Sequence, residues 1–439
     1  MLKAYCSSLN ADIYKPLTKL AQIIKQRIRA EGAIPFGRFM EIALYHPGLG
    51  YYASGRRRTG AAGDYYTSPQ AHPVFGALLA LQLEHMWQLM DRPARFHVVE
   101  AGAGEGRLAR DILEFSRYLE KGFRAALFYV AVDLPVAPYA AQLIGRYRGV
   151  DTAHLAVRYG EAPVPPDAAP RSRAVAGRGL PFRGLRGCIL SNELLDAFPV
   201  HRLVVEGGVL KEVYVALEKA ALVEVLGEPS PPVRDLMKDS AGLLPEGSAL
   251  EICPGVWDWM GEAAQALDRG FVLTIDYGYW DAPAEGSVTS YRRHAAASPY
   301  ELVGRQDLTA HVDFGAAREA GRRVGLQPVG LASQRRFLLD LGLGAFREAT
   351  ARLQLPQEQH QANQMAMLDL IRPEGLGSFG IMVQCRDMPG IKMSDLAPER
   401  PVKERLAAGE LPAPLLGKGH MPLLEGRYPH VAAKIGDLL

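Results

Sequence analysis

The stretch that decides the fold spans residues 98–108 and reads Val98-Val99-Glu100-Ala101-Gly102-Ala103-Gly104-Glu105-Gly106-Arg107-Leu108. Its apolar beginning predicts a β-strand, its three glycines a sharp turn, and the residues that follow a helix. Glycines let the backbone turn tightly and allow a ligand to lie directly against it. The N-terminal amides of the helix would then point at that ligand. A tight strand-to-helix turn that binds nothing is the alternative.

The spacing of the glycines indicates which ligand the turn would hold. A dinucleotide fingerprint places its third glycine three residues after the second, whereas Gly106 follows Gly104 by two. This spacing is more typical of methyltransferases that use S-adenosylmethionine (SAM). Asp133 comes directly after the next predicted strand, where a carboxylate can accept both ribose hydroxyls; a turn or capping role is the alternative. The predicted cofactor contacts here are Glu100, Gly102, Gly104, Gly106 and Asp133.

Length and composition limit the class of protein. The chain has 439 residues, 48% of them hydrophobic, which suffices for one large or two ordinary domains. A net charge of +2 gives no overall field that would favour nucleic acid or a membrane as partner. The four cysteines lie far apart, so we expect neither a metal site nor a disulfide framework. There is no apolar run of membrane-spanning length and no secretion signal, so we expect no membrane insertion and a bacterial cytoplasmic location.

Strand-like and helical segments alternate along the chain, which predicts a parallel sheet with crossover helices. The expected fold class is α/β, with a Rossmann-like, seven-stranded sheet of the SAM-methyltransferase type. Its strands are expected at residues 97–101, 127–132, 155–159, 187–191, 271–275, 327–332 and 378–384.

Three regions are expected along the chain. Residues 1–90 would form an N-terminal helical and lid region, and residues 91–387 the methyltransferase domain. A small β-rich insertion is expected at about residues 200–250, between the fourth and fifth strands. Residues 163–186 are rich in Pro, Arg, Ala and Gly and are interpreted as a loose surface loop. Residues 388–439 are interpreted as a Pro-rich extension that wraps the surface or lies partly disordered.

Polar side chains follow the fourth predicted strand in the run Ser191-Asn192-Glu193-Leu194-Leu195-Asp196-Ala197-Phe198-Pro199-Val200. Ligands of open α/β sheets lie beyond the carboxyl ends of the strands, so these groups are expected near the transferable methyl. Carboxylates can hold a guanidinium in bidentate geometry, and methyl transfer depends mainly on alignment. We therefore assign Glu193, Asn192 and Asp196 to orienting the nucleophile, with Asn192 also touching the cofactor. Ser191 or Asn192 as a helix cap is the alternative.

Two later runs supply further candidates. Asp276-Tyr277-Gly278-Tyr279 follows the fifth strand and either shapes the substrate pocket or forms a structural turn. Asp307-Leu308-Thr309-Ala310-His311-Val312-Asp313-Phe314 places a histidine near carboxylates. A neutral His311 could take the proton shed by a methylated nitrogen. A helix start capped by Asp307 or Thr309 is the alternative.

An N-terminal run joins glycine hinges to hydrogen-bond donors and aromatic rings: Gly63-Asp64-Tyr65-Tyr66-Thr67-Ser68-Pro69. Such a segment can form a lid that covers the cofactor and excludes water. Tyr66, Thr67 and Ser68 are its predicted contacts, and ordinary loop packing is the alternative.

Together these motifs resemble one family, the MidA-like SAM-dependent methyltransferases, whose mitochondrial members are arginine methyltransferases that assist assembly of respiratory complex I. The match spans about residues 15–387 in unbroken order. Two features depart from the family: Asp133 stands where a Glu is usual, and the Arg-rich loop at 171–186 and the tail beyond 390 match nothing in it. Besides the runs already quoted, the matching pieces are Ile34-Pro35-Phe36-Gly37-Arg38-Phe39-Met40, Tyr45-His46-Pro47, Gly50-Tyr51-Tyr52 and Tyr291-Arg292-Arg293-His294.

The resemblance implies SAM as cofactor and a protein as substrate. The prediction is a SAM-dependent methyltransferase that modifies protein arginine and, by the same resemblance, assists assembly of a respiratory complex. Two alternatives stay open: a small-molecule methyltransferase, and a SAM-binding assembly factor without essential catalysis. Neither the methyl acceptor nor the oligomeric state follows from the sequence.

Overall fold

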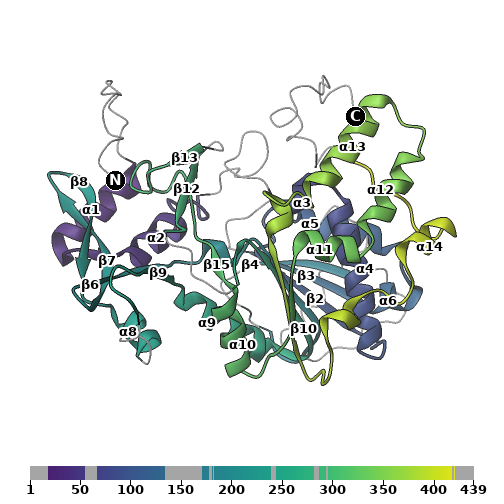
Figure 1. The fold of residues 1–439 in the computed structure, drawn as a ribbon, viewed down its shortest axis with the longest axis horizontal. Helices are drawn as coiled ribbons and strands as arrows, with labels where there is room; N and C mark the ends of the chain where they lie inside the picture. The colour runs from purple at the N-terminus through teal and green to yellow at the C-terminus, as the bar shows by residue number, and fades with distance from the viewer. Residues whose placement is uncertain are drawn as a thin grey trace.

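A seven-stranded sheet forms the centre of the molecule (Figure 1). The computed structural model describes residues 18–54, 67–133, 171–176, 180, 182–238, 244–280, 286–292, 295–417 and 420. β17 is antiparallel to both of its neighbours, and the other adjacent pairs are parallel. The strand order is β16 (Gln327–Ser333), β17 (Gly380–Arg386), β10 (Leu267–Asp276), β5 (Leu185–Asn192), β2 (Phe96–Ala101), β3 (Leu127–Asp133) and β4 (Arg171–Ala176).

Six of the predicted strands are confirmed. Four of them, β2, β3, β5 and β10, pair in parallel and are buried, and such strands have apolar sequences. The strand expected at residues 155–159 lies outside the described residues. The loop interpretation of 163–186 is wrong for β4, which pairs with β3 from Phe128↔Arg171 onward. Its sequence, Arg-Ser-Arg-Ala-Val-Ala, lacks an apolar run because β4 lies at the edge of the sheet, where polar residues are common.

Helices cover both faces of the sheet and produce three layers. On one face, side chains from α9 (Pro254–Ala266) and α10 (Phe314–Arg323) pack against the strands. The other face carries the largest hydrophobic core, around a helix buried on all sides, α4 (Val74–Leu89). The helices that contribute with α4 to this core include α5 (Arg107–Ser116), α6 (Lys121–Ala126), α11 (Gln334–Asp340), α12 (Leu343–Ala351) and α13 (Gln357–Asp369).

A second lobe, on the left in Figure 1, combines the N-terminal segment with the insertion after β5. Its sheet pairs an N-terminal strand with an insertion strand, Ile34 opposite Val215. N-terminal helices α1 (Lys19–Glu31) and α2 (Phe36–Tyr45) pack against this sheet, whereas α4 belongs to the main core. The other elements of the lobe are β1 (Ile34–Pro35), β6 (His201–Glu206), β7 (Val209–Glu218), β8 (Ala221–Gly227), α8 (Pro231–Met237) and β9 (Ala249–Ile252).

Several shorter elements complete the two lobes. β11 pairs in parallel with β15, and β12 pairs with β13 and β14 in a three-stranded antiparallel sheet. Their bounds are α3 (Ser68–Ala71), η2 (Leu195–Ala197), β11 (Gly278–Tyr279), β12 (Thr289–Arg292), β13 (Ala295–Ala297), β14 (Asp307–Thr309), β15 (Val312–Asp313) and η4 (Leu376–Ser378).

The C-terminal extension wraps the molecule over its described residues, 388–417 and 420. It contains η5 (Met393–Leu396) and α14 (Val402–Ala407), and buries Leu396, Val402 and Leu411 in the main core. Partial disorder is therefore wrong for this part of the extension. Among the described helices, we find none with the length and apolar character needed to span a membrane.

Candidate active site

The glycine loop after β2 lies at the carboxyl end of the sheet. Gly102, Gly104 and Gly106 have φ angles of 72°, 55° and 71°, a region that glycine adopts without strain. The amides of Gly102 and Ala103 donate to the carbonyl oxygen of Val132 at 2.9 and 3.1 Å and fasten the loop to β3. A Cβ atom added at Gly104 would meet nothing within 4 Å, and Gly104 lines a cavity. The loop therefore leaves room for a ligand.

Two acidic residues beside this loop face different surroundings. Asp133 ends β3, lines the cavity and accepts a hydrogen bond from the amide of Gly104 through Oδ2. Glu100 is 3% exposed, is not among the residues that line the cavity, and accepts a hydrogen bond from the Tyr129 hydroxyl at 2.7 Å. Burial raises the pKa of Glu100 to about 8. Asp133 is therefore placed to meet a ligand, whereas the Glu100 side chain contacts Tyr129 of β3 and does not line the cavity.

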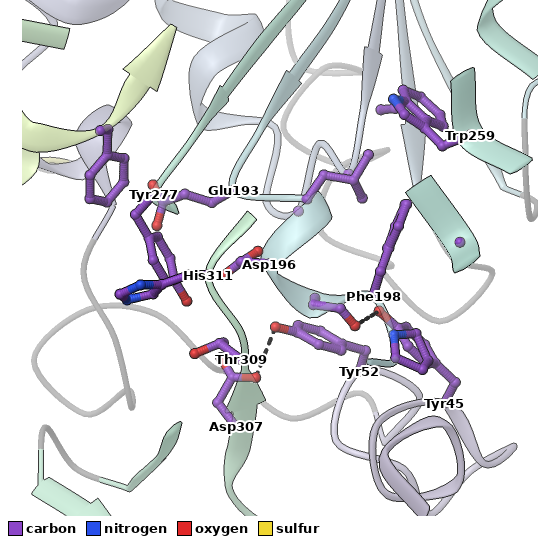
Figure 2. A pocket seen from close by; sticks show the side chains of 18 of the residues that line it. Tyr45, Tyr52, Glu193, Asp196, Phe198, Trp259, Tyr277, Asp307, Thr309 and His311 are labelled. Atoms are coloured by element: carbon purple, nitrogen blue, oxygen red, sulfur yellow. Dashed lines mark hydrogen bonds between the residues drawn. The ribbon is translucent and has the colours of Figure 1, made fainter. Parts of the chain in front are cut away.

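The cavity has a volume of about 790 Å³, which is within the usual range for cofactor and substrate sites (Figure 2). Segments far apart in the sequence form its wall. Tyr45 and Tyr52 come from α2 and the turn that follows it, and their rings stack with centroids 5.6 Å apart. Sequence reasoning missed both tyrosines as site residues, and also three residues of α9: Asp258, Trp259 and Glu262.

The acidic loop after β5 is held in an unusual backbone conformation. Glu193 has a φ angle of 51°, in the left-handed region that costs a non-glycine residue free energy and is often found at functional sites. The buried Asp276 fixes the loop, since its Oδ2 accepts hydrogen bonds from the amides of Leu194, Leu195 and Asp196 at 3.2, 2.9 and 3.3 Å. Asp276 therefore ends β10 and fastens the loop after β5, while Tyr277 of the same run lines the cavity.

The Glu193 carboxylate is the point where several predicted residues meet. Its Oε1 accepts hydrogen bonds from Asn192 Nδ2 at 3.1 Å and from the Ser68 amide at 3.4 Å. Burial, with the Asp196 carboxyl nearby, raises the pKa of Glu193 to about 8. Burial likewise raises the pKa of Asp196 to about 6. Asp196 is 6% exposed and lines the cavity, and its Oδ1 has no hydrogen-bond partner among the described residues.

Of the predicted lid contacts, Ser68 lies beside Glu193 rather than on the cavity wall. Thr67 forms a capping box with Gln70 at the start of α3, and Ser68 is fully buried in α3. Neither lines the cavity, nor does Asn192, whose contact is the Glu193 carboxylate. Gly106 precedes α5 and is also absent from the wall. Tyr66 lies outside the described residues, as does the rest of the lid run before Thr67.

The later run adds a third carboxylate to the site and overturns the helix-cap interpretation of Asp307 and Thr309. Both lie in β14, and the helix α10 is capped instead by Asp313, whose Oδ1 accepts from the Ala316 amide at 2.8 Å. Asp307 is 2% exposed, lines the cavity and accepts a hydrogen bond from Tyr52 at 2.9 Å. Asp307 and Asp196 both line this cavity (Figure 2).

His311, which the sequence analysis proposed as a proton acceptor, lines the cavity. Its ring packs against Tyr277 in an edge-to-face arrangement, with centroids 5.5 Å apart at 87°. Burial lowers the pKa of His311, so its imidazole is neutral at physiological pH. A neutral imidazole has one nitrogen able to accept a proton.

The wall of the cavity carries one sign of charge. No lysine or arginine is among the described residues that line it. A cavity of this kind favours a cation over an anion. Its eight acidic residues are Glu41, Asp133, Glu193, Asp196, Asp258, Glu262, Asp307 and Glu374.

Asp133 lines the cavity next to the glycine loop, and the sequence predicts that its carboxylate accepts hydrogen bonds from the ribose of an adenosyl cofactor. We expect Asp133→Ala to weaken binding of S-adenosylhomocysteine about 10- to 100-fold, since a hydrogen bond to a charged group contributes roughly 1.5–3 kcal/mol. Calorimetric titration measures this effect. Asp133→Asn keeps an acceptor for the Gly104 amide but removes the charge, so its affinity should lie between those of wild type and Asp133→Ala. Equal affinities for all three proteins would contradict this role.

Comparison with known proteins points to the same cofactor. Residues 78–332, more than half of the chain, match the family described as "putative S-adenosyl-L-methionine-dependent methyltransferase". The crystal structure of a protein from Burkholderia thailandensis, described as a likely methyl transferase and bound to S-adenosyl-homocysteine, is 27% identical in sequence to this chain. The two structures superpose with a TM-score of 0.68, and the match covers 86% of this chain and 94% of that chain.

Curated relatives are named protein arginine methyltransferases. The Drosophila melanogaster mitochondrial NDUFAF7 homolog is 28% identical over 51% of this chain, which spans about half (52%) of that protein's length. The Mus musculus mitochondrial NDUFAF7 protein is 26% identical over 78% of each chain. The match of residues 78–332, together with the similarity to the S-adenosyl-homocysteine-bound crystal structure, shows that the chain belongs to the family of SAM-dependent methyltransferases described above.

Proposed function

We propose that this enzyme methylates arginine side chains of proteins. The observation that carries the proposal is the carboxylate wall of the cavity, where Asp196 Oδ1 is buried without a hydrogen-bond partner among the described residues. A buried carboxylate oxygen of this kind is costly unless a donor or cation meets it. A guanidinium offers five N–H donors in a planar fork that matches carboxylates. The names of the curated relatives support the same substrate class.

Each part of the site has a role in this proposal. The glycine loop and Asp133 hold the cofactor, which supplies a methyl group bound to a positively charged sulfur. Glu193 and Asp196 bind and orient the guanidinium, and Asn192 positions Glu193 through its 3.1 Å hydrogen bond. Alignment of a nucleophile in this way can provide much of the rate acceleration.

Asp307 provides a third carboxylate for the guanidinium. The Tyr52 hydroxyl holds one of its oxygens at 2.9 Å, and the stacked Tyr45 is itself fixed by a 2.8 Å hydrogen bond to the carbonyl oxygen of Ala197. Aromatic rings beside carboxylates also suit a delocalised cation, because a guanidinium stacks on their faces.

His311 accepts the proton that the methylated nitrogen releases. Its lowered pKa keeps the imidazole neutral and therefore able to take a proton. Because an imidazole is a far weaker base than a free guanidine, proton transfer follows the start of methyl transfer rather than preceding it.

The raised pKa values of Glu193 and Asp196 predict how activity depends on pH. Both groups must be ionised to hold a cation, and they become protonated as the pH falls through about 8 and about 6. We therefore expect kcat/KM to rise between pH 6 and pH 9, because kcat/KM reports the free enzyme. A pH series with wild type and Glu193→Gln tests this, since the variant lacks the upper titration. A flat profile for the wild type over this range would refute the assignment.

Transfer from labelled SAM tests the proposed substrate class. The enzyme is incubated with an extract from cells of its source that lack it, and the labelled protein is hydrolysed to amino acids. We expect label in methylarginine with wild type and a strong reduction with Glu193→Gln. Label confined to metabolites would instead favour a small-molecule methyltransferase. Bound SAM with no transfer to any acceptor would favour an assembly factor, and label on a respiratory-complex subunit would support a role in its assembly.

A further inference from the structure

The end of the described C-terminal extension contacts two helices, α13 and α5. Residues 412–417 and His420, which we call the C-terminal strap, follow the part of the extension that is buried in the main core. The strap touches α13 and α5, and α13 in turn touches the segment that connects α3 to α4. No residue of the strap has a role in the catalytic proposal above.

The first contact passes through Asn363 of α13 to His72. Asn363 Oδ1 accepts hydrogen bonds from the strap amide of Leu416 at 2.9 Å and from His72 Nε2 at 3.0 Å. His72 Nδ1 accepts from the Val74 amide at 3.0 Å, so the proton of the ring must be on Nε2. His72 is fully buried, and burial lowers its pKa to about 3, which keeps it in this neutral form.

The second contact joins the strap to the helix that carries the glycine loop. His420 Nε2 lies 2.6 Å from Asp111 Oδ2, and both residues are buried. The other oxygen of Asp111 accepts from Arg110 Nε at 3.1 Å. Asp111 is one turn into α5, whose first residue, Arg107, directly follows the last glycine of the loop.

The element α3 transmits the first contact to the catalytic carboxylate. His72 directly follows α3, in which the Ser68 amide lies 3.4 Å from Glu193 Oε1. The hydroxyl of Ser68 donates to Gln334 Oε1 at 2.9 Å, and Gln334 is itself fully buried. The strap is therefore linked to Glu193 on one side and to the glycine loop on the other.

We propose that the C-terminal strap positions α3 and α5 relative to each other, and so pre-organises the cofactor site, with His72, Asn363 and His420 as positioning residues. A site that is already ordered loses less conformational freedom when its ligand binds. Without the strap, α3 and the start of α5 would fluctuate more, and cofactor binding would have to order them. This proposal does not depend on whether the methyl acceptor is arginine.

Two variants of His420 test the proposal with the full-length chain. His420→Leu removes the hydrogen bond to Asp111, whereas His420→Gln keeps an N–H donor at a similar distance from the backbone. We expect His420→Leu to weaken S-adenosylhomocysteine binding about three- to tenfold, the range of one lost hydrogen bond, and to speed amide exchange of residues 67–72 in the free protein. His420→Gln should restore both. A chain that ends at Leu411 should bind S-adenosylhomocysteine more weakly than His420→Leu does, and its residues 67–72 should exchange faster than those of His420→Leu.

A matched control lies in the same extension. Arg400→Ala removes an exposed ion pair with Glu410 that touches neither α3 nor α5, so it should leave affinity and exchange unchanged. The proposal is overturned if His420→Leu lowers the melting temperature while S-adenosylhomocysteine affinity and α3 exchange match the wild type, because the strap would then be only a stabilising contact. Since the point variants decide this, a truncated chain that fails to fold does not alter the test.

Discussion

Gly104→Val should lose most of its affinity for SAM and S-adenosylhomocysteine. Gly104 lines the cavity, and the space next to its Cα, where a Cβ would meet nothing within 4 Å, is the space a bound cofactor needs. A bulky side chain forced into a close contact costs roughly 1–3 kcal/mol, and moving the loop away would also break the hydrogen bond from the Gly104 amide to Asp133. We expect binding to weaken by about 100-fold or more, since each 1.4 kcal/mol is tenfold.

Backbone strain must be separated from this steric effect. The φ angle of Gly104 is 55°, and a β-branched residue there destabilises the fold by roughly 1–2 kcal/mol whatever the ligand. Gly390 provides a control, because its φ angle is 82° and a Cβ there also meets nothing within 4 Å, but it does not line the cavity. Gly390→Val should lower thermal stability and keep full affinity in calorimetric titration. If Gly104→Val binds S-adenosylhomocysteine as tightly as Gly390→Val, the glycine loop does not hold the cofactor.

Glu193→Gln should reduce methyl transfer about 100- to 1,000-fold, with SAM affinity close to that of the wild type. The amide preserves the shape of the side chain but has no charge for a cationic nucleophile. Removal of one oriented electrostatic group from an active site typically costs this much in kcat. The contacts that hold the cofactor in our proposal come from the glycine loop and Asp133, which the substitution leaves in place.

An exposed carboxylate outside the cavity serves as the control. Glu399 does not line the cavity and is exposed to solvent, so Glu399→Gln should change turnover by less than about threefold. Single-turnover measurements with labelled SAM and an accepted protein substrate compare the variants. Wild-type turnover by Glu193→Gln, or an equal loss in both variants, would remove Glu193 from the catalytic role.

The position of the glycine loop and Asp133 at one cavity could be predicted from the sequence because local features determine it. A buried strand, three glycines at positive φ and a helix start form one continuous segment, and Asp133 ends the neighbouring strand. The order of strands in a sheet of this type places the ends of β2, β3 and β5 side by side. For the same reason, Glu193 and Asp196 were found from their position after an apolar strand.

The tertiary structure alone decided which of several similar residues face the cavity. Asp307 and Thr309 fit a helix cap in the sequence, but pairing with β12 makes them a strand and brings Asp307 to Tyr52, 255 positions away. Glu100 belongs to the glycine motif, yet the alternation of side chains along β2 turns it toward Tyr129.

Long-range contacts also explain the two segments whose structure differs from the sequence prediction, β4 and the C-terminal extension. β4 has no apolar run, and it is a strand because the edge of β3 offers its backbone groups to pair with. The sequence of the C-terminal extension is polar and rich in Pro, but three apolar side chains pack it against the main core: Leu396, Val402 and Leu411. Periodicity and spacing along the chain indicate which face of a segment is buried, but they do not say which distant segment covers it, and the free energy of burial against that partner selects the final arrangement.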